Sequence, residues 1–179
     1  KPKNHWHIHE IWQPDTFFSL TEKIETKPEV FFSKLLPFIT LEPQPYFNLW
    51  DVLRDKRDIK HEDYCLKAPF SDFKFFEILA DNLPETVNLH FSNSSAIRYA
   101  QLFEFKTNSI HCNRGTSGID GCTSTAMGFA MKAKEQTVLV TGDVSFFYDI
   151  NGLWNNYIPP YTRIIVFNNG GGDIVKIIP

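Results

Sequence analysis

After about residue 69, short apolar runs alternate with helical stretches, and this alternation constrains the fold more than any other feature of the 179-residue sequence. The runs VLV and IIVF are continuously apolar, which is typical of strands buried on both faces of a sheet. Strands that alternate with helices of roughly 10–13 residues predict βαβ units and a parallel sheet. We therefore expect an α/β fold of three layers, with helices on both faces of a mostly parallel sheet. The predicted strands are 87–91, 109–112, 137–141 and 163–167, and the predicted helices are 73–83, 95–105, 122–134 and 146–156.

The first 69 residues follow a different pattern. Residues 5–13 alternate in polarity, with Trp6 and Ile8 on one face and histidines on the other, which predicts a half-buried strand. A helix that begins at Pro28 should end just before Pro37, because proline disrupts a helix interior. A second extended stretch at 17–21, a proline-rich linker at 37–46 and a charged helix at 47–60 complete this part. The predicted organisation is a short segment at 1–27, a linker with helices at 28–69 and the α/β domain at 70–179.

Composition narrows the class of protein. Lys and Arg number 18 against 21 Asp and Glu, a net charge of −3, which disfavours a nucleic-acid partner. No apolar run approaches the roughly 18–20 residues of a membrane span, and the first ten residues lack the apolar core of a signal peptide. Cys65, Cys112 and Cys122 lack CxxC spacing and are interpreted as free thiols of a reducing compartment. These features favour a cytoplasmic location.

Two polar residues follow neighbouring apolar runs and are candidates for binding a cation. Asp143 and Asn169 are 26 residues apart, each lies just after a predicted strand, and one helix separates the strands. A right-handed crossover would make these strands parallel, with both carboxyl ends on one edge. Their side-chain oxygens, with the carbonyl of Gly171, would suit Mg²⁺, which prefers oxygen ligands. For either feature alone, the alternative is a helix cap at Asp143 or a simple Asn-Gly turn.

The stretch GDVSFFYDING…VFNNGGG resembles the diphosphate-binding motif of thiamine-diphosphate enzymes, with Val144 where many of them have a second glycine. Its Gly-Asp-x-Ser form resembles one branch, the 2-succinyl-5-enolpyruvyl-6-hydroxy-3-cyclohexene-1-carboxylate synthases of menaquinone (vitamin K2) biosynthesis. NRGTSGIDG (113–121), SNSSAIR (92–98) and GGDIVKIIP (171–179) are similar to further segments of that family. The stretch HWHIHEIWQPDTFFSLTEKI resembles the end of its middle domain, so 1–27 would be a remnant of that domain.

The resemblance implies a thiamine diphosphate and Mg²⁺ (or Mn²⁺) site. Asp143, Asn169 and the Gly171 carbonyl would hold the cation. Ile119 would be an apolar wedge that bends the cofactor. Other residues implied to contact the cofactor are Gly142, Val144 and Ser145 at the diphosphate, and Ser117 and Gly118 near the pyrimidine.

The resemblance also implies a substrate site. Ser94, Arg98 and Arg114 would bind the carboxylates of 2-oxoglutarate and isochorismate, with Ile119 and the two arginines as the catalytic set. An arginine fork suits carboxylates because it donates two parallel hydrogen bonds. An apolar wall would be formed by Ile174, Val175 and Ile178, with Val175 where the family pattern predicts phenylalanine.

The implied activity is that of a carboligase transferase: decarboxylation of 2-oxoglutarate and 1,4-addition of the resulting succinyl carbanion to isochorismate. In this family an activating glutamate lies in an N-terminal pyrimidine-binding domain of a second subunit, so the intact enzyme would be a homo-oligomer, a dimer or tetramer. We interpret residues 70–179 as a diphosphate-binding domain truncated at its C-terminus. The 179 residues alone are expected to be inactive.

Two other functions remain open. One is a different thiamine-diphosphate enzyme, a 2-oxo acid decarboxylase or an acetolactate-type synthase. Arg98 and Arg114 disfavour it, because a pyruvate-type pocket binds a single carboxylate. The other is a non-catalytic ligand-binding or assembly domain, which the presence of both Asp143 and Asn169 disfavours.

Two further features of the sequence have both a structural and a functional interpretation. His5, His7 and His9 share a strand face, but residues two apart on a strand lie about 6.6–6.8 Å apart, which is awkward for three ligands of one metal ion. A solvent-facing polar side is therefore favoured. Asp149 either orients the helix after the cation loop or lies behind the cation's ligands.

Overall fold

The computed structural model describes residues 2–40 and 45–172, and the chain divides into two compact units, Lys1–Asp55 and Lys56–Pro179. The division falls inside the helix α2 (Pro45–Lys67). Each unit is described by itself.

In the first unit, two short strands, β1 (Trp6–Ile8) and β2 (Glu22–Ile24), pair in parallel and are followed by α1 (Pro28–Leu35) and the single-turn helix η1 (Leu36–Phe38). The helix predicted to begin at Pro28 and end before Pro37 is confirmed. Because Pro28 is the first helical residue, its missing N–H costs no helical hydrogen bond.

Both predicted extended stretches of the first unit differ from the structure. The strand predicted at 5–13 ends at Ile8, because the ring Nδ1 of His9 accepts hydrogen bonds from the backbone N–H groups of Ile11 and Trp12 and turns the chain. The extended stretch predicted at 17–21 is a turn, in which the Asp15 carboxylate accepts from two backbone N–H groups, and the second strand begins at Glu22. Local side-chain bonds to the backbone compete here with strand pairing.

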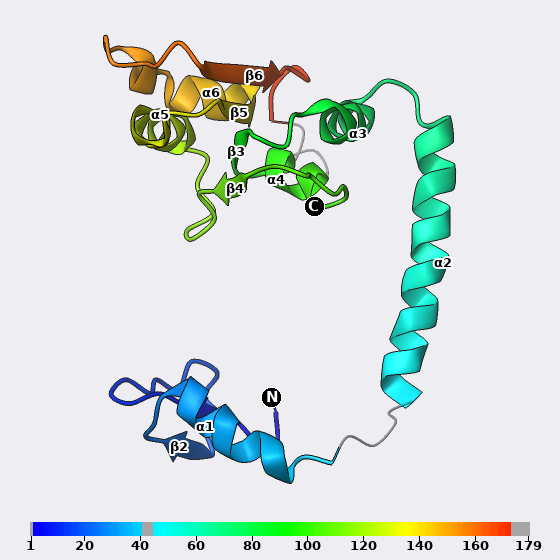
Figure 1. Ribbon diagram of the computed structural model, residues 1–179, viewed down its shortest axis with the longest axis vertical. Helices are drawn as coiled ribbons and strands as arrows, with labels where there is room; N and C mark the ends of the chain where they lie inside the picture. Colours follow the sequence, from blue (N-terminus) through cyan, green and yellow to red (C-terminus); the bar gives the residue numbers. More distant parts are fainter. Residues whose placement is uncertain (1, 41–44, 173–179) are drawn as a thin grey trace. The chain divides into compact units, whose positions relative to one another are not determined.

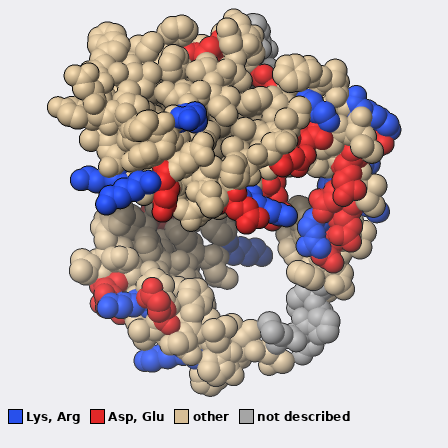
Figure 2. All heavy atoms as spheres, turned by 45° about the horizontal axis from the view of Figure 1, so that its top comes forward, with Lys and Arg blue, Asp and Glu red and all other residues tan. Residues whose placement is uncertain are grey.

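The helix α2 carries the charged run predicted at 47–60 and extends beyond it at both ends. None of its residues is buried. Blue and red side chains are intermixed along α2 at the right of Figure 2, and Arg54 pairs with Asp51 at 2.6 Å. Such exposed pairs contribute little stability, and the intermixed charges are typical of a solvated helix face.

The second unit is built on a four-stranded sheet in which every pairing is parallel (Figure 1). Its order is β4-β3-β5-β6, so β3 and β5 are central. The four predicted strands are confirmed, with boundaries that shift by at most one residue. They are β3 (Asn88–Phe91), β4 (Ser109–Cys112), β5 (Thr137–Gly142) and β6 (Thr162–Phe167).

Helices cover both faces of this sheet, as predicted. On one face, α3 (Asp72–Asn82) and α4 (Ser95–Ala100) pack on β3 and β5. On the other face, α5 (Cys122–Ala133) and the single-turn helix η2 (Ile150–Leu153) pack around Leu139. The short helix α6 (Asp143–Tyr148) connects β5 to η2.

Of the helices predicted beside the sheet, two differ from the structure by more than one residue at an end. The helix predicted at 95–105 ends at Ala100, where the backbone N–H groups of Leu102 and Phe103 bond to carbonyls three residues back and tighten the chain into turns. The helix predicted at 146–156 begins earlier, at Asp143, and ends at Tyr148. It ends because Asp149 leaves the helical conformation and bonds to α5.

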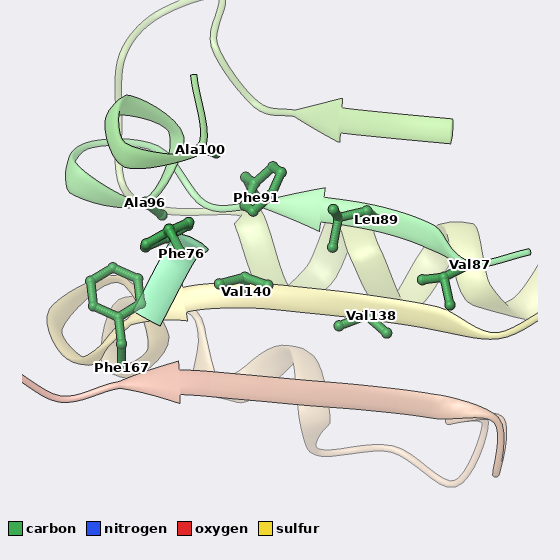
Figure 3. Close-up of a cluster of buried hydrophobic side chains, with 9 residues drawn as sticks. All are labelled: Phe76, Val87, Leu89, Phe91, Ala96, Ala100, Val138, Val140 and Phe167. Atoms are coloured by element: carbon green, nitrogen blue, oxygen red, sulfur yellow. The ribbon is translucent and has the colours of Figure 1, made fainter. Parts of the chain in front are cut away.

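The larger core lies between the sheet and α3 and α4. Figure 3 shows Phe76 of α3 between Phe91 of β3 and Phe167 of β6, and Phe76 is 0% exposed. The ring centroids of Phe76 and Phe167 are 5.5 Å apart in an edge-to-face arrangement. Other phenylalanines lie at the surface, among them Phe70, which is 82% exposed.

Among the described helices, none combines the length and the apolar character that crossing a bilayer requires.

Candidate functional site at the carboxyl edge of the sheet

A cleft lies at the carboxyl ends of the four parallel strands. Its empty volume is about 590 Å³, which includes space open to solvent. The chain reverses direction across the sheet between β3 and β5, with α4 on one face and α5 on the other, and α/β sheets bind ligands at such a point. The cleft is lined by Asn93, Ser94, Ser95, Ala96, Ile119, Gly142, Asp143, Val144, Ser145, Phe167, Asn169 and Gly172.

Asp143 and Asn169 both line this cleft. β5 and β6 are parallel neighbours, as predicted, and in their register Gly142 is opposite Phe167. Asp143 follows Gly142 directly, and Asn169 lies two residues beyond Phe167. The two polar residues therefore reach one edge of the sheet, whereas their binding of a cation stays a prediction.

The Asn169 side chain is oriented by a residue far away in the sequence. Its Nδ2 donates a hydrogen bond to Oδ2 of Asp72, the first residue of α3, at 2.9 Å. A carboxylate only accepts, so the NH₂ group of the amide faces Asp72 and the amide oxygen takes no part in this contact. Sequence reasoning missed Asp72, because it lies 97 residues from Asn169 and belongs to no motif.

The start of α6 is held to the loop between β4 and α5. The hydroxyl of Ser145, which is buried, donates to the carbonyl oxygen of Ile119 at 2.7 Å. The backbone N–H of Val144 donates to Oδ1 of Asp143 at 2.8 Å. Ile119 thereby lies against the helix that carries Asp143, and both residues line the cleft.

The loop NRGTSGIDG is tied at its ends and in its middle. Asn113 Nδ2 donates to the carbonyl oxygen of Gly121 at 3.0 Å, which closes the loop. Asn93, which lines the cleft, accepts a bond from Arg114 at 2.6 Å and donates to the carbonyl oxygen of Gly118 at 2.9 Å. Asn93 therefore connects the end of β3 with this loop. Asn93 belongs to the segment SNSSAIR, but the sequence analysis assigned roles only to Ser94 and Arg98 of that segment.

Ser94 lines the cleft in a backbone conformation that side chains disfavour. Its φ is 69° and its ψ is −129°, a region that only glycine adopts readily. Its side chain makes no capping bond to α4, so the cap does not compensate for the strain. Strain of this kind is concentrated at ligand sites.

Several predicted site residues do not line the cleft. Arg98 and Ser117 are exposed and do not line the cleft. Arg114 and Gly118 do not line it either, but both are hydrogen-bonded to Asn93, which does. Of the glycines after Asn169, Gly172 lines the cleft and Gly171 does not. Three predicted residues of the apolar wall, Ile174, Val175 and Ile178, lie outside the described residues.

Asp149 bonds to the first turn of α5 and does not line the cleft. It is 6% exposed, and its two oxygens accept the backbone N–H and the hydroxyl of Ser124, both at 2.6 Å. Ser124 lies in the first turn of α5, whose N–H groups have no helical partner. A negative charge there is also favoured by the helix dipole.

The donors in the cleft suit a hard cation rather than zinc. Asp143 supplies carboxylate oxygen and Asn169 amide oxygen, the ligand types that Mg²⁺ prefers. Within residues 2–40 and 45–172, no three His, Cys, Asp or Glu side chains are grouped to hold a metal ion, and this range includes His5, His7 and His9.

Burial, with the neighbouring Cys122, raises the pKa of the Cys112 thiol beside the loop, so it stays protonated at neutral pH.

Curated relatives match the chain from end to end. A 2-succinyl-5-enolpyruvyl-6-hydroxy-3-cyclohexene-1-carboxylate synthase from Flavobacterium psychrophilum is 51% identical over 180 residues, 100% of this chain and 33% of that protein. The chain belongs to this synthase family. The synthase of the same name from Flavobacterium johnsoniae is 49% identical over 100% of the chain and 32% of its own length. That from Christiangramia forsetii is 48% identical over 99% of the chain and 31% of its own length.

These matches cover residues 1–69 as well as the α/β unit, whereas the motifs of the synthase family are concentrated after residue 92. The chain spans about a third of the length of the curated synthases that it matches, 33% in the first case. No family model matches the chain.

Proposed function

We propose that this chain holds the diphosphate and the cation of thiamine diphosphate in a synthase of menaquinone biosynthesis. The observation that carries the proposal is the convergence of Asp143 and Asn169 on one cleft from neighbouring strands. The names of the relatives support the synthase activity, and the oxygen donors of the cleft fit Mg²⁺ or Mn²⁺.

Different residues of the cleft would bind the cation, the diphosphate and the middle of the cofactor. Asp143 and the amide oxygen of Asn169 would hold the cation, together with the carbonyl oxygen of Gly171 in a loop whose glycines have positive φ. The backbone at Gly142, Val144 and Ser145 would line the diphosphate. Ile119 would press an apolar side chain on the middle of the cofactor, with its carbonyl held by Ser145.

When bound, the cofactor would supply the electron sink for decarboxylation of a 2-oxo acid. The proposed substrates are 2-oxoglutarate and isochorismate, each with two carboxylates. Ser94 lies in the cleft, and Arg114 reaches it through Asn93, so these residues would orient one carboxylate. Arg98, exposed on α4, would meet the second substrate at the rim. We also propose that Ile174, Val175 and Ile178, which lie outside the described residues, form the apolar wall of the substrate site.

The complete reaction would require a full-length synthase. We propose that the pyrimidine of the cofactor is held by an N-terminal domain of a second subunit, so that the working enzyme is a homo-oligomer, a dimer or tetramer, in the cytoplasm. In this arrangement residues 1–27 end a middle domain, 28–69 are a linker with helices, and 70–179 bind the diphosphate.

Calorimetric titration with thiamine diphosphate in Mg²⁺ tests the proposal. We expect binding by the native chain that is lost with a chelator, and at least a tenfold loss of affinity in Asp143→Ala, because one cation ligand is removed. Asp120→Ala is the matched control, since Asp120 is exposed in the neighbouring loop and does not line the cleft. Unaltered affinity in Asp143→Ala, or no binding by the native chain, would contradict the proposal.

A further inference from the structure

We propose that Asp72 is a positioning residue of the cation site, which fixes the Asn169 amide with its oxygen toward the cleft. This inference rests on the proposed function, because it assigns a partner to one of the proposed cation ligands. No motif of the sequence includes Asp72, and the contact exists only in the folded chain.

The first support is the packing that brings the two residues together. Asp72 and Phe76 are four residues apart in α3 and therefore lie on the same face of the helix. Phe76 packs on Phe167, with ring centroids 5.5 Å apart, and Asn169 is two residues beyond Phe167. The packing that anchors α3 on β6 thus places the first residue of α3 beside Asn169.

The second support is the fixed start of α3. Ser71 is the N-cap of this helix, and its hydroxyl oxygen accepts from the backbone N–H of Lys74 at 3.4 Å. Asp72 is the next residue and is half-buried. Its carboxylate therefore projects from a capped, well-packed helix end rather than from a loose loop.

The third support is the chemistry of the contact. An asparagine amide can present either its oxygen or its NH₂ group to a cation, and only the oxygen is a ligand. The Asp72 carboxylate accepts from Nδ2 at 2.9 Å, and the flipped amide would place two acceptors against each other. Asp72 thereby selects the orientation that binds a cation, and its charge polarises the amide oxygen further.

The test uses Mn²⁺ as a spectroscopic probe, with free ion measured by electron paramagnetic resonance at a fixed excess of thiamine diphosphate. Asp72→Ala should weaken Mn²⁺ binding about tenfold, in the range found when a residue behind a metal ligand is removed. Asp72→Asn should have an Mn²⁺ affinity between those of the native chain and Asp72→Ala. Its amide oxygen can still accept a hydrogen bond from Nδ2 of Asn169, but its NH₂ group also tolerates the flipped Asn169 amide. Asp81→Asn, exposed near the other end of α3, is the matched control and should leave binding unchanged.

A double-mutant cycle separates positioning from structural damage. In the Asn169→Ala background, Asp72→Ala should cause little further loss, because the ligand that it orients is gone. A loss as large as in the native background, or no loss in either background, would overturn the inference. If Asn169→Ala and Asp143→Ala both leave Mn²⁺ binding unchanged, the proposed function itself fails, and this outcome is distinct from failure of the inference. Thermal unfolding of each variant, followed by circular dichroism, gives a temperature at which all variants are folded, and Mn²⁺ binding is measured at that temperature.

Discussion

Asp149 accepts two hydrogen bonds from Ser124, one from its backbone N–H and one from its hydroxyl, both at 2.6 Å. The pair joins the end of α6 to the first turn of α5, the two helices that flank the carboxyl end of β5. Asp149 is also the C-cap of α6, so one carboxylate connects the end of α6 with the start of α5.

Asp149→Ala should lower the free energy of unfolding by about 2–3 kcal/mol, because a buried carboxylate and its two charge-assisted bonds are lost. Ser124→Ala removes only the hydroxyl and should cost about 1 kcal/mol. Urea denaturation followed by circular dichroism measures both. Equal and small losses in the two variants would show that the carboxylate does not cap α5 in solution.

Acid should destabilise the protein through His90. Burial, with the stacked His111, lowers the pKa of His90 from 6.5 to about 4. Between these values the unfolded chain binds the proton and the folded chain does not, so stability falls as the pH decreases through this window. The free energy of unfolding should fall by about 2 kcal/mol between pH 7 and pH 5 from this residue alone.

His90→Phe is the matched variant, because a phenyl ring keeps the stacked contact with His111 and the edge-on contact with Phe129 and does not titrate. Its unfolding free energy should depend less steeply on pH than that of the native chain between pH 7 and pH 5. Parallel pH profiles of the two proteins would refute the assignment of this slope to His90.

Replacement of Ser94 should separate backbone strain from side-chain chemistry. Ser94→Gly relieves the strained backbone and Ser94→Ala retains it, while both remove the hydroxyl. The glycine variant should therefore be more stable than the alanine variant by about 1 kcal/mol, the reverse of their order in a regular helix. Thermal or urea unfolding of the two variants decides this, and greater stability of the alanine variant would show that the backbone at this position is unstrained.

The 179 residues by themselves should bind thiamine diphosphate without turning over 2-oxoglutarate and isochorismate. Among the described residues that line the cleft, Asp143 is the only ionisable one, so none is a glutamate that would activate the cofactor. Release of CO₂ from labelled 2-oxoglutarate measures turnover, with a full-length synthase as the positive control. Clear turnover by the chain alone would mean that another group activates the cofactor.

The α/β part of the fold could be predicted from the sequence because its signals are local. The strand Ser109–Cys112 was predicted without error, and the run of β5 differs by one residue. Where predictions failed, a side-chain bond to the backbone had ended the element: a long-range bond from Asp149 to Ser124 at the end of α6, and local bonds to His9 at the end of the first strand. Propensity does not include such contacts, so boundaries were predicted less well than the elements themselves.

The candidate site divides in the same way. The sequence by itself determined that Asp143 and Asn169 follow successive strands of a βαβ unit, because right-handed connection of parallel strands leaves one arrangement for them. Only the tertiary structure decided that Asp72 and Asn93 take part, and that Arg98 lies outside the cleft. Their positions depend on how α3 and the loop after β4 pack on the sheet, and packing joins residues that are distant along the chain and share no local pattern.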